Sequence, residues 1–332
     1  MKHPMLTILL TAFVISLHCG CLRALPCPPM PDLKNVTEFI CSSPTLSEFP
    51  SGFPKQTRLI TVEFTNVSII GVDSLRALPD LQELHLSNNK LKTLPNSLFR
   101  YLPKLQAVDL TNNLLRDLPP GIFRNNTALK HVALKGNRLA VLRSVWFETL
   151  RQLQFLDLSE NLLAELPPFC FDTLENLTSL DLSYNRLREL SPRIFAGLAS
   201  LTGLNLEGNH IQTVQEKTFR AVPNLQFVFL QNNSLANLPA KIFQSLDFLE
   251  MLDLSQNRLT SLDPEFSDQV TEMSLDLSEN LWVCDCRMKA LLDWVKSRSI
   301  NLLSKKSTIC ASPNKLKGRE IASLKPDDFG SC

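Results

Sequence analysis

Apolar positions recur along most of this chain of 332 residues with a fixed period of 24. One unit contains Leu153, Leu156, Leu158 and Asn161, which gives the pattern L-x-x-L-x-L-x-x-N. The alternation around Asp157 predicts a short strand with Leu156 and Leu158 directed inward and the aspartate outward. A single coil of 24 residues cannot bury its own apolar side chains, so successive coils must stack. The pattern therefore predicts a solenoid with one strand in each coil.

Two further positions keep the same period, and they define an asparagine ladder and a phenylalanine spine. Each ladder Asn follows a strand, where its amide offers donors and an acceptor to backbone groups of the stacked coils. The spine residues should stack between coils on the convex side. The consensus identifies leucine-rich repeats, and we expect an α/β solenoid, a horseshoe with parallel strands on its concave face. The ladder comprises Asn89, Asn113, Asn137, Asn161, Asn185, Asn209, Asn233, Asn257 and Asn280, and the spine Phe99, Phe123, Phe147, Phe171, Phe195, Phe219 and Phe243.

About ten repeats fill residues 59–280. The first is degenerate, and we expect Val62 and Phe64 to point inward with Val67 at the ladder position. The last is one residue short and ends at Trp282. Atypical end units are expected, because the open ends of a solenoid need caps. We therefore expect an N-terminal cap over residues 25–58 and a cysteine-rich C-terminal cap over 281–332. The repeats begin at Leu59, Leu81, Leu105, Leu129, Leu153, Leu177, Leu201, Leu225, Leu249 and near Glu272.

The first 24 residues have the features of a secretory signal peptide. Lys2 precedes an apolar run over residues 6–17, and Ala24 is a small residue suited to the cleavage site, with cleavage after Cys21 as the alternative. No later apolar stretch approaches the roughly 18 residues that a membrane span needs. The chain also ends without a hydrophobic tail for a lipid anchor. We therefore expect a secreted protein, free in an extracellular fluid and without a membrane anchor.

Seven cysteines lie beyond the expected signal peptide, and their placement predicts two disulfide-closed caps. Cys27 and Cys41 can close the N-terminal cap. Four cysteines follow the last repeat, and they allow three pairings. A zinc site is the competing interpretation of Cys-x-Cys, but secretion and the lack of nearby histidines favour disulfides. The four cysteines of the C-terminal cap are Cys284, Cys286, Cys310 and Cys332.

Cys170 has no expected partner. It directly precedes the spine residue Phe171, at a position that other repeats fill with Leu98, Ile122 or Trp146. We therefore expect a small buried hydrophobe with a raised pKa and little reactivity. An intermolecular disulfide is the alternative.

Five Asn-x-Ser/Thr sequons predict glycosylation in a secreted chain, and an attached glycan would keep its surroundings exposed. Asn233, next to one acceptor, belongs to the ladder and is not itself an acceptor. The predicted acceptors are Asn35, Asn66, Asn125, Asn176 and Asn232.

No arrangement of residues indicates catalysis. Beyond the expected signal peptide the chain has three histidines, His85, His131 and His210, and we expect all three to be solvated surface residues. No motif places a serine or cysteine nucleophile with a base, and no glycine-rich phosphate loop occurs. We therefore expect a binding protein that is not an enzyme and needs no cofactor or metal.

Solenoids usually bind partners on the concave strand face. Six of the ten residues midway between the inward positions are acidic, so this central column should carry a line of negative charge about 40 Å long at about 4.8 Å per strand. The structural alternative is that Leu-Asp-Leu is a common, solubilising form of the repeat. The expected column is Glu63, His85, Asp109, Ala133, Asp157, Asp181, Asn205, Phe229, Asp253 and Asp276.

We expect a partner to contact both the charge and the aromatic side chains of this face. Phe227 and Phe229, with Met251 beside them, should be exposed there and serve as apolar anchors. The candidate partner-binding aspartates are Asp109, Asp157, Asp181 and Asp253.

Charge is unevenly distributed, although the whole chain has a net charge of only +1. The 51 residues from Trp282 onward hold ten Lys or Arg and five Asp or Glu, which leaves the repeats net negative. A negative solenoid with a basic cap favours a cationic partner steered to the concave face, or the approach of one molecule's cap to another's solenoid. The acidic face and the extracellular compartment disfavour nucleic acid.

The combination of caps and repeats resembles known plasma proteins. A two-cysteine N-terminal cap, unbroken 24-residue repeats and a C-terminal cap without an anchor resemble leucine-rich alpha-2-glycoprotein and, more closely, the beta-type phospholipase A2 inhibitors of snake blood plasma. The stretch from Asn280 to Cys286 is similar to the usual entry into the C-terminal cap, although Leu281 stands where that family has proline. Small matrix proteoglycans are less similar, because their N-terminal cap carries four cysteines.

The resemblance implies a plasma protein that binds and inhibits basic phospholipase A2 enzymes as a homo-oligomer. It also implies that Cys284 pairs with Cys310 and Cys286 with Cys332. The alternative is a glycoprotein that binds growth-factor-type ligands or cytochrome c. A structural matrix role would require collagen binding or attached glycosaminoglycan, and nothing in the sequence supports either.

Overall fold

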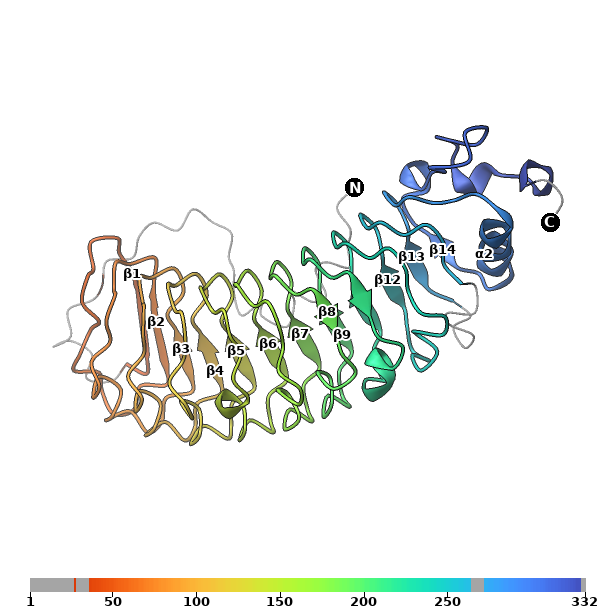
Figure 1. Ribbon diagram of the computed structural model, residues 1–332. Helices are drawn as coiled ribbons and strands as arrows, with labels where there is room; N and C mark the ends of the chain where they lie inside the picture. The colour runs from red at the N-terminus through yellow and green to blue at the C-terminus, as the bar shows by residue number, and fades with distance from the viewer. Residues whose placement is uncertain (1–26, 28–35, 264–271, 330–332) are drawn as a thin grey trace.

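The computed structural model describes residue 27 and residues 36–263 and 272–329 as a curved solenoid (Figure 1). One sheet of twelve strands runs through it, with every pair parallel and in sequence order. This confirms the predicted fold class. The expected signal peptide, Asn35 and Cys332 lie outside the described residues. The strands are β1 (Glu38–Ser42), β2 (Leu59–Glu63), β3 (Glu83–His85), β4 (Ala107–Asp109), β5 (His131–Ala133), β6 (Phe155–Asp157), β7 (Ser179–Asp181), β9 (Gly203–Asn205), β11 (Phe227–Phe229), β12 (Met251–Asp253), β13 (Ser274–Asp276) and β14 (Asn301–Leu302).

The asparagine ladder joins each coil to the coil before it. Asn161 donates from Nδ2 to the carbonyl of Leu134, 27 residues earlier, and to those of Leu158 and Ser159 in its own coil. Its Oδ1 accepts the N–H of Leu139 at 3.0 Å. Both the donors and the acceptor of the amide are therefore used, and the same pattern recurs from Asn113 to Asn257.

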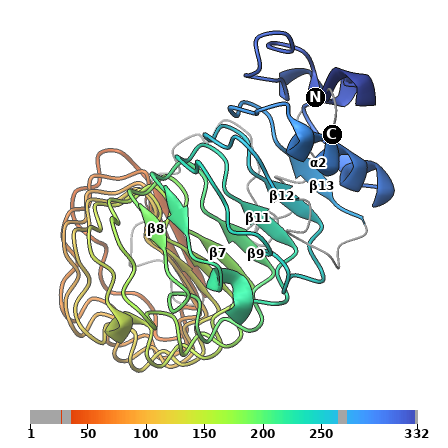
Figure 2. The ribbon, with the colours of Figure 1, turned by 45° about the vertical axis from the view of Figure 1, so that its right-hand side comes forward.

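The convex side contains little regular structure (Figure 2). All seven spine phenylalanines are fully buried. Neighbouring rings stack, with centroids 5.5 Å apart for Phe99 and Phe123 and 5.2 Å apart for Phe219 and Phe243. The remaining convex elements are a two-stranded sheet of β8 (Glu189–Leu190) and β10 (Thr213–Val214), and 3-10 turns at Ser144–Trp146 and Thr218–Ala221.

The first repeat differs from the prediction by two positions. Thr65, not Val67, occupies the ladder position, and its hydroxyl donates to Oδ1 of Asn89. Ile60 and Val62 are the inward residues, whereas Phe64 is exposed. Phe64 has a φ of 53°, the left-handed conformation of the residue before each ladder asparagine. The expected inward position of Phe64 was therefore wrong. The register of this repeat could not be recognised from the sequence, because Thr replaces the ladder Asn.

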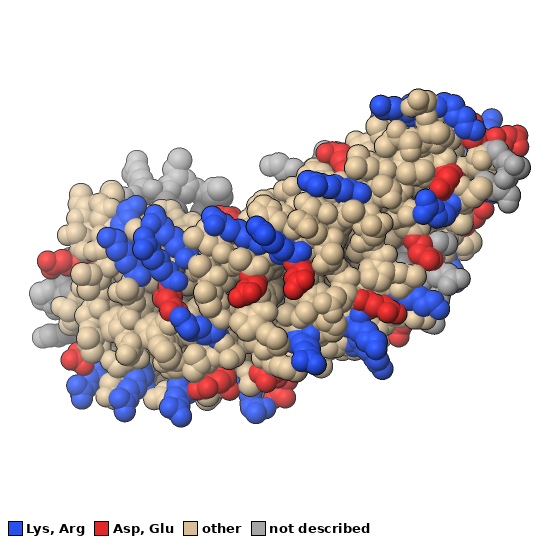
Figure 3. Space-filling model, viewed as in Figure 1, with Lys and Arg blue, Asp and Glu red and all other residues tan. Residues whose placement is uncertain are grey.

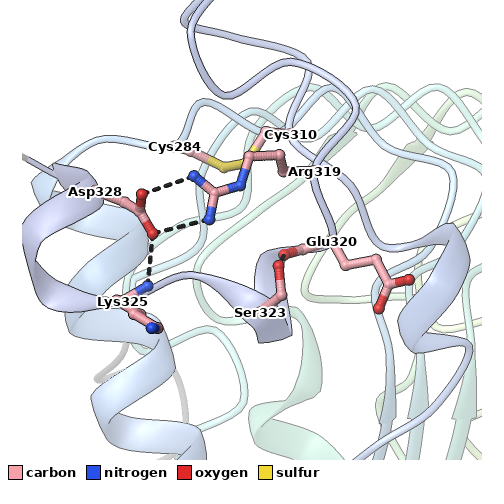
Figure 4. The surroundings of a disulfide bond; sticks show 7 residues. All are labelled: Cys284, Cys310, Arg319, Glu320, Ser323, Lys325 and Asp328. Atoms are coloured by element: carbon pink, nitrogen blue, oxygen red, sulfur yellow. Dashed lines mark hydrogen bonds and ion pairs between the residues drawn. A yellow bond between two sulfur atoms is a disulfide. The ribbon is translucent and has the colours of Figure 1, made fainter.

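Each end of the solenoid carries a disulfide. Cys27 bonds to Cys41, and Cys284 bonds to Cys310 as the resemblance implied. Cys286 is also disulfide-bonded, and Cys332, its expected partner, lies outside the described residues. Beside the Cys284–Cys310 bond, the Arg319 guanidinium donates to both carboxylate oxygens of Asp328 at 2.7 and 3.0 Å (Figure 4).

The spacing of Met288, Leu291, Leu292 and Val295 predicts a helix near residues 287–298, and the C-terminal cap contains α2 (Cys286–Ser297) there. Asp285 caps its first turn by accepting the N–H of Arg287 at 2.9 Å. Met288, Leu291 and Leu292 are buried, as the apolar spacing predicted. None of the helices in the described ranges is long and apolar enough to cross a membrane. Short 3-10 turns at Lys305–Ser307, Ile321–Ser323 and Pro326–Phe329 complete the cap.

Cys170 is buried and forms no disulfide. Burial raises the pKa of its thiol to about 12. It lies in the same apolar cluster as the spine, as expected for a residue that replaces a core aliphatic.

Candidate partner-binding face

The concave sheet brings four predicted aspartates into one line. In the strand register His85 lies opposite Asp109, and the same position continues through Asp157, Asp181 and Asp253. At the N-terminal end, Thr61 and not Glu63 faces His85, so Glu63 is not a member of the column. The central column is therefore acidic at five of its ten positions rather than six. Its members are Thr61, His85, Asp109, Ala133, Asp157, Asp181, Asn205, Phe229, Asp253 and Asp276.

The column aspartates have a local structural role. In each case Oδ1 accepts the backbone N–H two residues further on, at 2.8–2.9 Å. The hydroxyls of Ser159, Ser183 and Ser255 add a second bond to the same oxygen at 2.6–2.7 Å. These bonds satisfy the backbone where the chain leaves the strand. The recurrence of Asp at this position therefore has a structural cause, whether or not a partner also uses it.

Burial, with a smaller contribution from neighbouring carboxylates, shifts the pKa of two column aspartates. Burial, followed by the charge of Asp181 on the next strand, raises the pKa of Asp157 to about 6, although hydrogen bonds from Ser159 oppose the shift. Burial also raises the pKa of Asp253. Lys135 lies near this part of the column and pairs with Glu160 at 3.1 Å. A partner that brings positive charge to the face would relieve the repulsion between Asp157 and Asp181.

The apolar anchors are less accessible than predicted. Phe229 is only 8% exposed and Met251 only 7%, so the expectation that both are exposed was wrong. Neither belongs to the buried core cluster, so they are covered by neighbours on the concave face. Met251 lies directly opposite Phe227 in the register, and strands about 4.8 Å apart let such wide side chains cover one another. Phe227 itself is half-buried and stays available.

Further along the face lies an aromatic residue that the sequence also suggests as an interface anchor. Tyr184 is 48% exposed and has a φ of 52°, at the position before the ladder residue Asn185. Its hydroxyl donates to Oε1 of Glu207, and this bond is the main cause that raises the pKa of Tyr184 to about 12. A Cβ at Gly208 would meet the Tyr184 ring at 2.6 Å, so the glycine allows the ring to lie over the next coil.

Two of the three histidines are not the solvated residues that were expected. The His85 side chain is 16% exposed, and its Nε2 lies 3.2 Å from Oε2 of Glu83. Ligand atoms of Glu63, His85 and Asp109 lie within 4.8 Å of one another. His131 packs against Phe155 with ring centroids 6.4 Å apart, and burial lowers its pKa. His210 is exposed. The strand periodicity placed His85 in the column, but the proximity of Glu63 depends on the register of the first repeat.

The predicted glycan acceptors Asn66, Asn125, Asn176 and Asn232 are all exposed. On the face shown in Figure 3, Lys and Arg gather over the N-terminal repeats as well as over the C-terminal cap. Positive charge is therefore not confined to the cap.

Comparisons with known proteins identify the repeats and some relatives. The family model described as Leucine rich repeat matches residues 56–115, 103–163, 156–211 and 223–281. A phospholipase A2 inhibitor of Gloydius brevicaudus siniticus and phospholipase A2 inhibitor beta of Elaphe climacophora are each 55% identical over 100 residues. Each match covers 30% of this chain and 30% of the relative. Reticulon-4 receptor-like 2 of Homo sapiens is 34% identical over 58 residues, 18% of this chain and 13% of that protein.

Solved structures agree on the fold. A chain of the glycosylated Toll–Spatzle complex of Drosophila has a TM-score of 0.74 and 26% identity, and the match covers 90% of this chain and 46% of that one. A chain of an octameric complex that contains Latrophilin 3 has a TM-score of 0.70 at 22% identity, with 90% of this chain and 98% of that chain covered. With the strand order and the ladder already established, the family match over more than half of the chain shows that it belongs to the leucine-rich repeat family, and its sequence is similar to snake phospholipase A2 inhibitors.

Proposed function

We propose that this chain is a secreted, glycosylated plasma protein that binds basic phospholipase A2 enzymes and inhibits them without catalysing a reaction. The observation that carries the proposal is the 55% identity over 100 residues to two proteins named as phospholipase A2 inhibitors. That identity extends beyond what the repeat consensus requires. The segment-by-segment repeat match and the two end disulfides support a rigid binding scaffold.

The concave face favours a basic partner over an acidic one. Asp109, Asp157, Asp181 and Asp253 are aligned across the sheet, and burial together with the charge of Asp181 raises the pKa of Asp157. A Lys or Arg brought between these carboxylates removes their repulsion and gains charge-assisted hydrogen bonds. Long-range attraction would also steer a cationic enzyme to the face and raise its association rate.

Phe227 is the apolar anchor that the structure leaves available. It is half-buried and lies opposite Met251 on the neighbouring strand. An aromatic side chain that is already partly ordered loses little entropy when a partner covers it. Phe229 and Met251 would then flank Phe227 and would not contact the partner over a large area.

Inhibition and binding kinetics of variants test the proposal. The variant D157N/D181N/D253N keeps an oxygen to accept each serine N–H, so it should fold normally. It should associate with a basic phospholipase A2 several-fold more slowly at low salt, and the association rate should depend less on salt. F227A should instead dissociate faster and lose about 2 kcal/mol of binding free energy. A matched control is D73N/D172N/D247N, which neutralises three exposed carboxylates outside the sheet.

The alternatives give different results. If neither a basic nor an acidic phospholipase A2 is bound or inhibited, the proposed function is wrong. If both enzymes bind with equal affinity and the concave triple variant behaves like the control, the function stands but a different surface carries it. We also propose that the active form is a homo-oligomer, which sedimentation of the glycosylated protein would show as a multiple of the chain mass.

A further inference from the structure

A group of metal-ligating side chains lies at the N-terminal end of the concave face, apart from Asp157, Asp181 and Asp253. Glu63 at the end of β2, His85 at the end of β3 and Asp109 at the end of β4 each offer one ligand atom, and these atoms lie within 4.8 Å of one another. His85 and Asp109 face each other across neighbouring strands. Glu63 lies two residues beyond the residue paired with His85, and its longer side chain covers that distance. All three are partly buried.

These distances fit the size of a coordinated cation. Two ligands of one ion can be no farther apart than twice the metal–ligand bond, which is about 4.0–4.4 Å for zinc and about 5 Å for calcium. The group needs at most a small movement to close around zinc, and Glu63 has a flexible side chain that can supply it. An imidazole with two carboxylates favours zinc or another first-row transition ion over calcium or magnesium, which prefer oxygen alone.

The surrounding residues orient the candidate ligands. Nε2 of His85 lies 3.2 Å from Oε2 of Glu83, which leaves Nδ1 for an ion. A histidine that ligates a metal commonly donates its other ring nitrogen to a carboxylate in this way. Ser87 donates its hydroxyl to Oε1 of Glu63 at 2.9 Å and leaves Oε2 available. Asp109 accepts the N–H of Thr111 with Oδ1.

Like Asp157 and Asp253, Asp109 uses only Oδ1 in its hydrogen bonds to described residues, unlike two other aspartates of the central column. Oδ2 of Asp181 accepts a hydrogen bond from Asn205, and Oδ2 of Asp276 accepts one from Ser304. Within the described residues, Oδ2 of Asp109 has no hydrogen-bond partner and is free to ligate. Burial raises the pKa of Glu63, hydrogen bonding by Ser87 opposes the shift, and the nearby charge of Asp109 raises it again. A cation between the two carboxylates would remove that repulsion.

From this geometry we propose that Glu63, His85 and Asp109 bind one divalent transition-metal ion, with zinc as the best match, and that Glu83 positions His85 for it. The three side chains leave a fourth position of a tetrahedral zinc open on the concave face, for water or for a donor group of a bound protein. The proposal is independent of the phospholipase A2 function, because metal binding is measured on the isolated protein.

Calorimetric titration of the chelator-treated, untagged glycoprotein with zinc tests the proposal. One ion should bind per chain, and H85Q, E63Q and D109N should each weaken binding at least tenfold. E83Q should weaken it about 10–100-fold, the range expected when a residue that orients a metal-bound histidine is changed. H131Q and D157N are matched controls, because they make the same chemical changes on the same face outside the group, and they should bind zinc like the unmodified protein.

A second measurement does not depend on any variant. Cobalt bound by one imidazole and two carboxylates should show visible absorption of a low-coordinate site, and added zinc should abolish it. The proposal is overturned if the unmodified protein binds no zinc at about 100 µM, a concentration that would fill even a weak site. It is also overturned if H85Q binds zinc as tightly as H131Q does.

Discussion

Removing one ladder asparagine should destabilise the whole solenoid, and Asn161 in a central coil gives the clearest case. Its Nδ2 donates to carbonyls of two coils, and its Oδ1 accepts the N–H of Leu139. The side chain is only 4% exposed, so water cannot replace these bonds readily. In N161A, the Leu139 N–H loses its acceptor and the Leu134 carbonyl loses a donor.

The expected magnitude follows from the Leu139 N–H, because the Leu134 carbonyl still accepts a hydrogen bond from Asn137 at 2.9 Å. A buried polar group left without a partner costs about 1–3 kcal/mol, so N161A should lower the free energy of unfolding by about 1–3 kcal/mol. Urea denaturation followed by circular dichroism measures this, with the midpoint shifting to lower urea. N96A is the matched control, because Asn96 is exposed and lies outside the ladder, and it should change the free energy by no more than about 0.5 kcal/mol.

The result that would refute the reasoning is a loss below about 1 kcal/mol in N161A, close to that of N96A. Such a result would mean that coil stacking tolerates the unpaired backbone groups, either by a shift of the turn or by entry of water. The repeated hydrogen bonds would then follow from the packing of the leucines and would not help to cause it.

Two further predictions concern buried titratable groups. The buried Cys170 thiol, with its pKa raised to about 12, should resist alkylation in the native protein and react as a single thiol after denaturation. Rapid labelling of the native protein, or a dimer that reducing agents separate, would contradict the burial of this thiol. The folded pKa of about 6 at Asp157 lies above its ordinary value of 3.8, so this group's stabilising contribution is present below pH 4 and is lost as the pH rises through 6. Between pH 5 and 7.5, D157N should therefore gain about 1–1.5 kcal/mol of stability relative to the unmodified protein in urea denaturation, and an unchanged difference would contradict the shift.

The regular part of the fold could be predicted because each repeat position has one environment. The ladder amide of Asn161 and the ring of Phe171 meet the same neighbours as their counterparts 24 residues away. The period therefore predicts strand order, parallel pairing and the convex spine together. In the first repeat Thr65 stands at the ladder position in place of Asn, so that position could not be recognised from the sequence. The predicted register of this repeat was therefore wrong by two residues.

The candidate site was harder to predict, because exposure on a concave sheet depends on neighbours that lie one coil away. Phe229 and Met251 alternate outward along their strands, as the sequence indicated, yet neighbouring side chains cover them. The proximity of Glu63 to His85 likewise depends on strand register and on the reach of a long side chain. The strand period predicts the direction in which a side chain points, whereas its exposure depends on how side chains of neighbouring strands pack beside it.

Residues that the repeat does not need are the best guide to what this solenoid binds. The column aspartates recur because their Oδ1 atoms accept backbone N–H groups, so their presence alone says little about a partner. Glu63, His85, Tyr184 and Phe227 depart from the repeat, and the phenylalanine spine and asparagine ladder would be unchanged without them. Exposed aromatic rings lower solubility and neighbouring carboxylates repel one another, and the repeat gains no stability from these four residues in return. Binding specificity should therefore depend more on these four residues than on the aspartates, which supply mainly the charge that attracts a cationic partner.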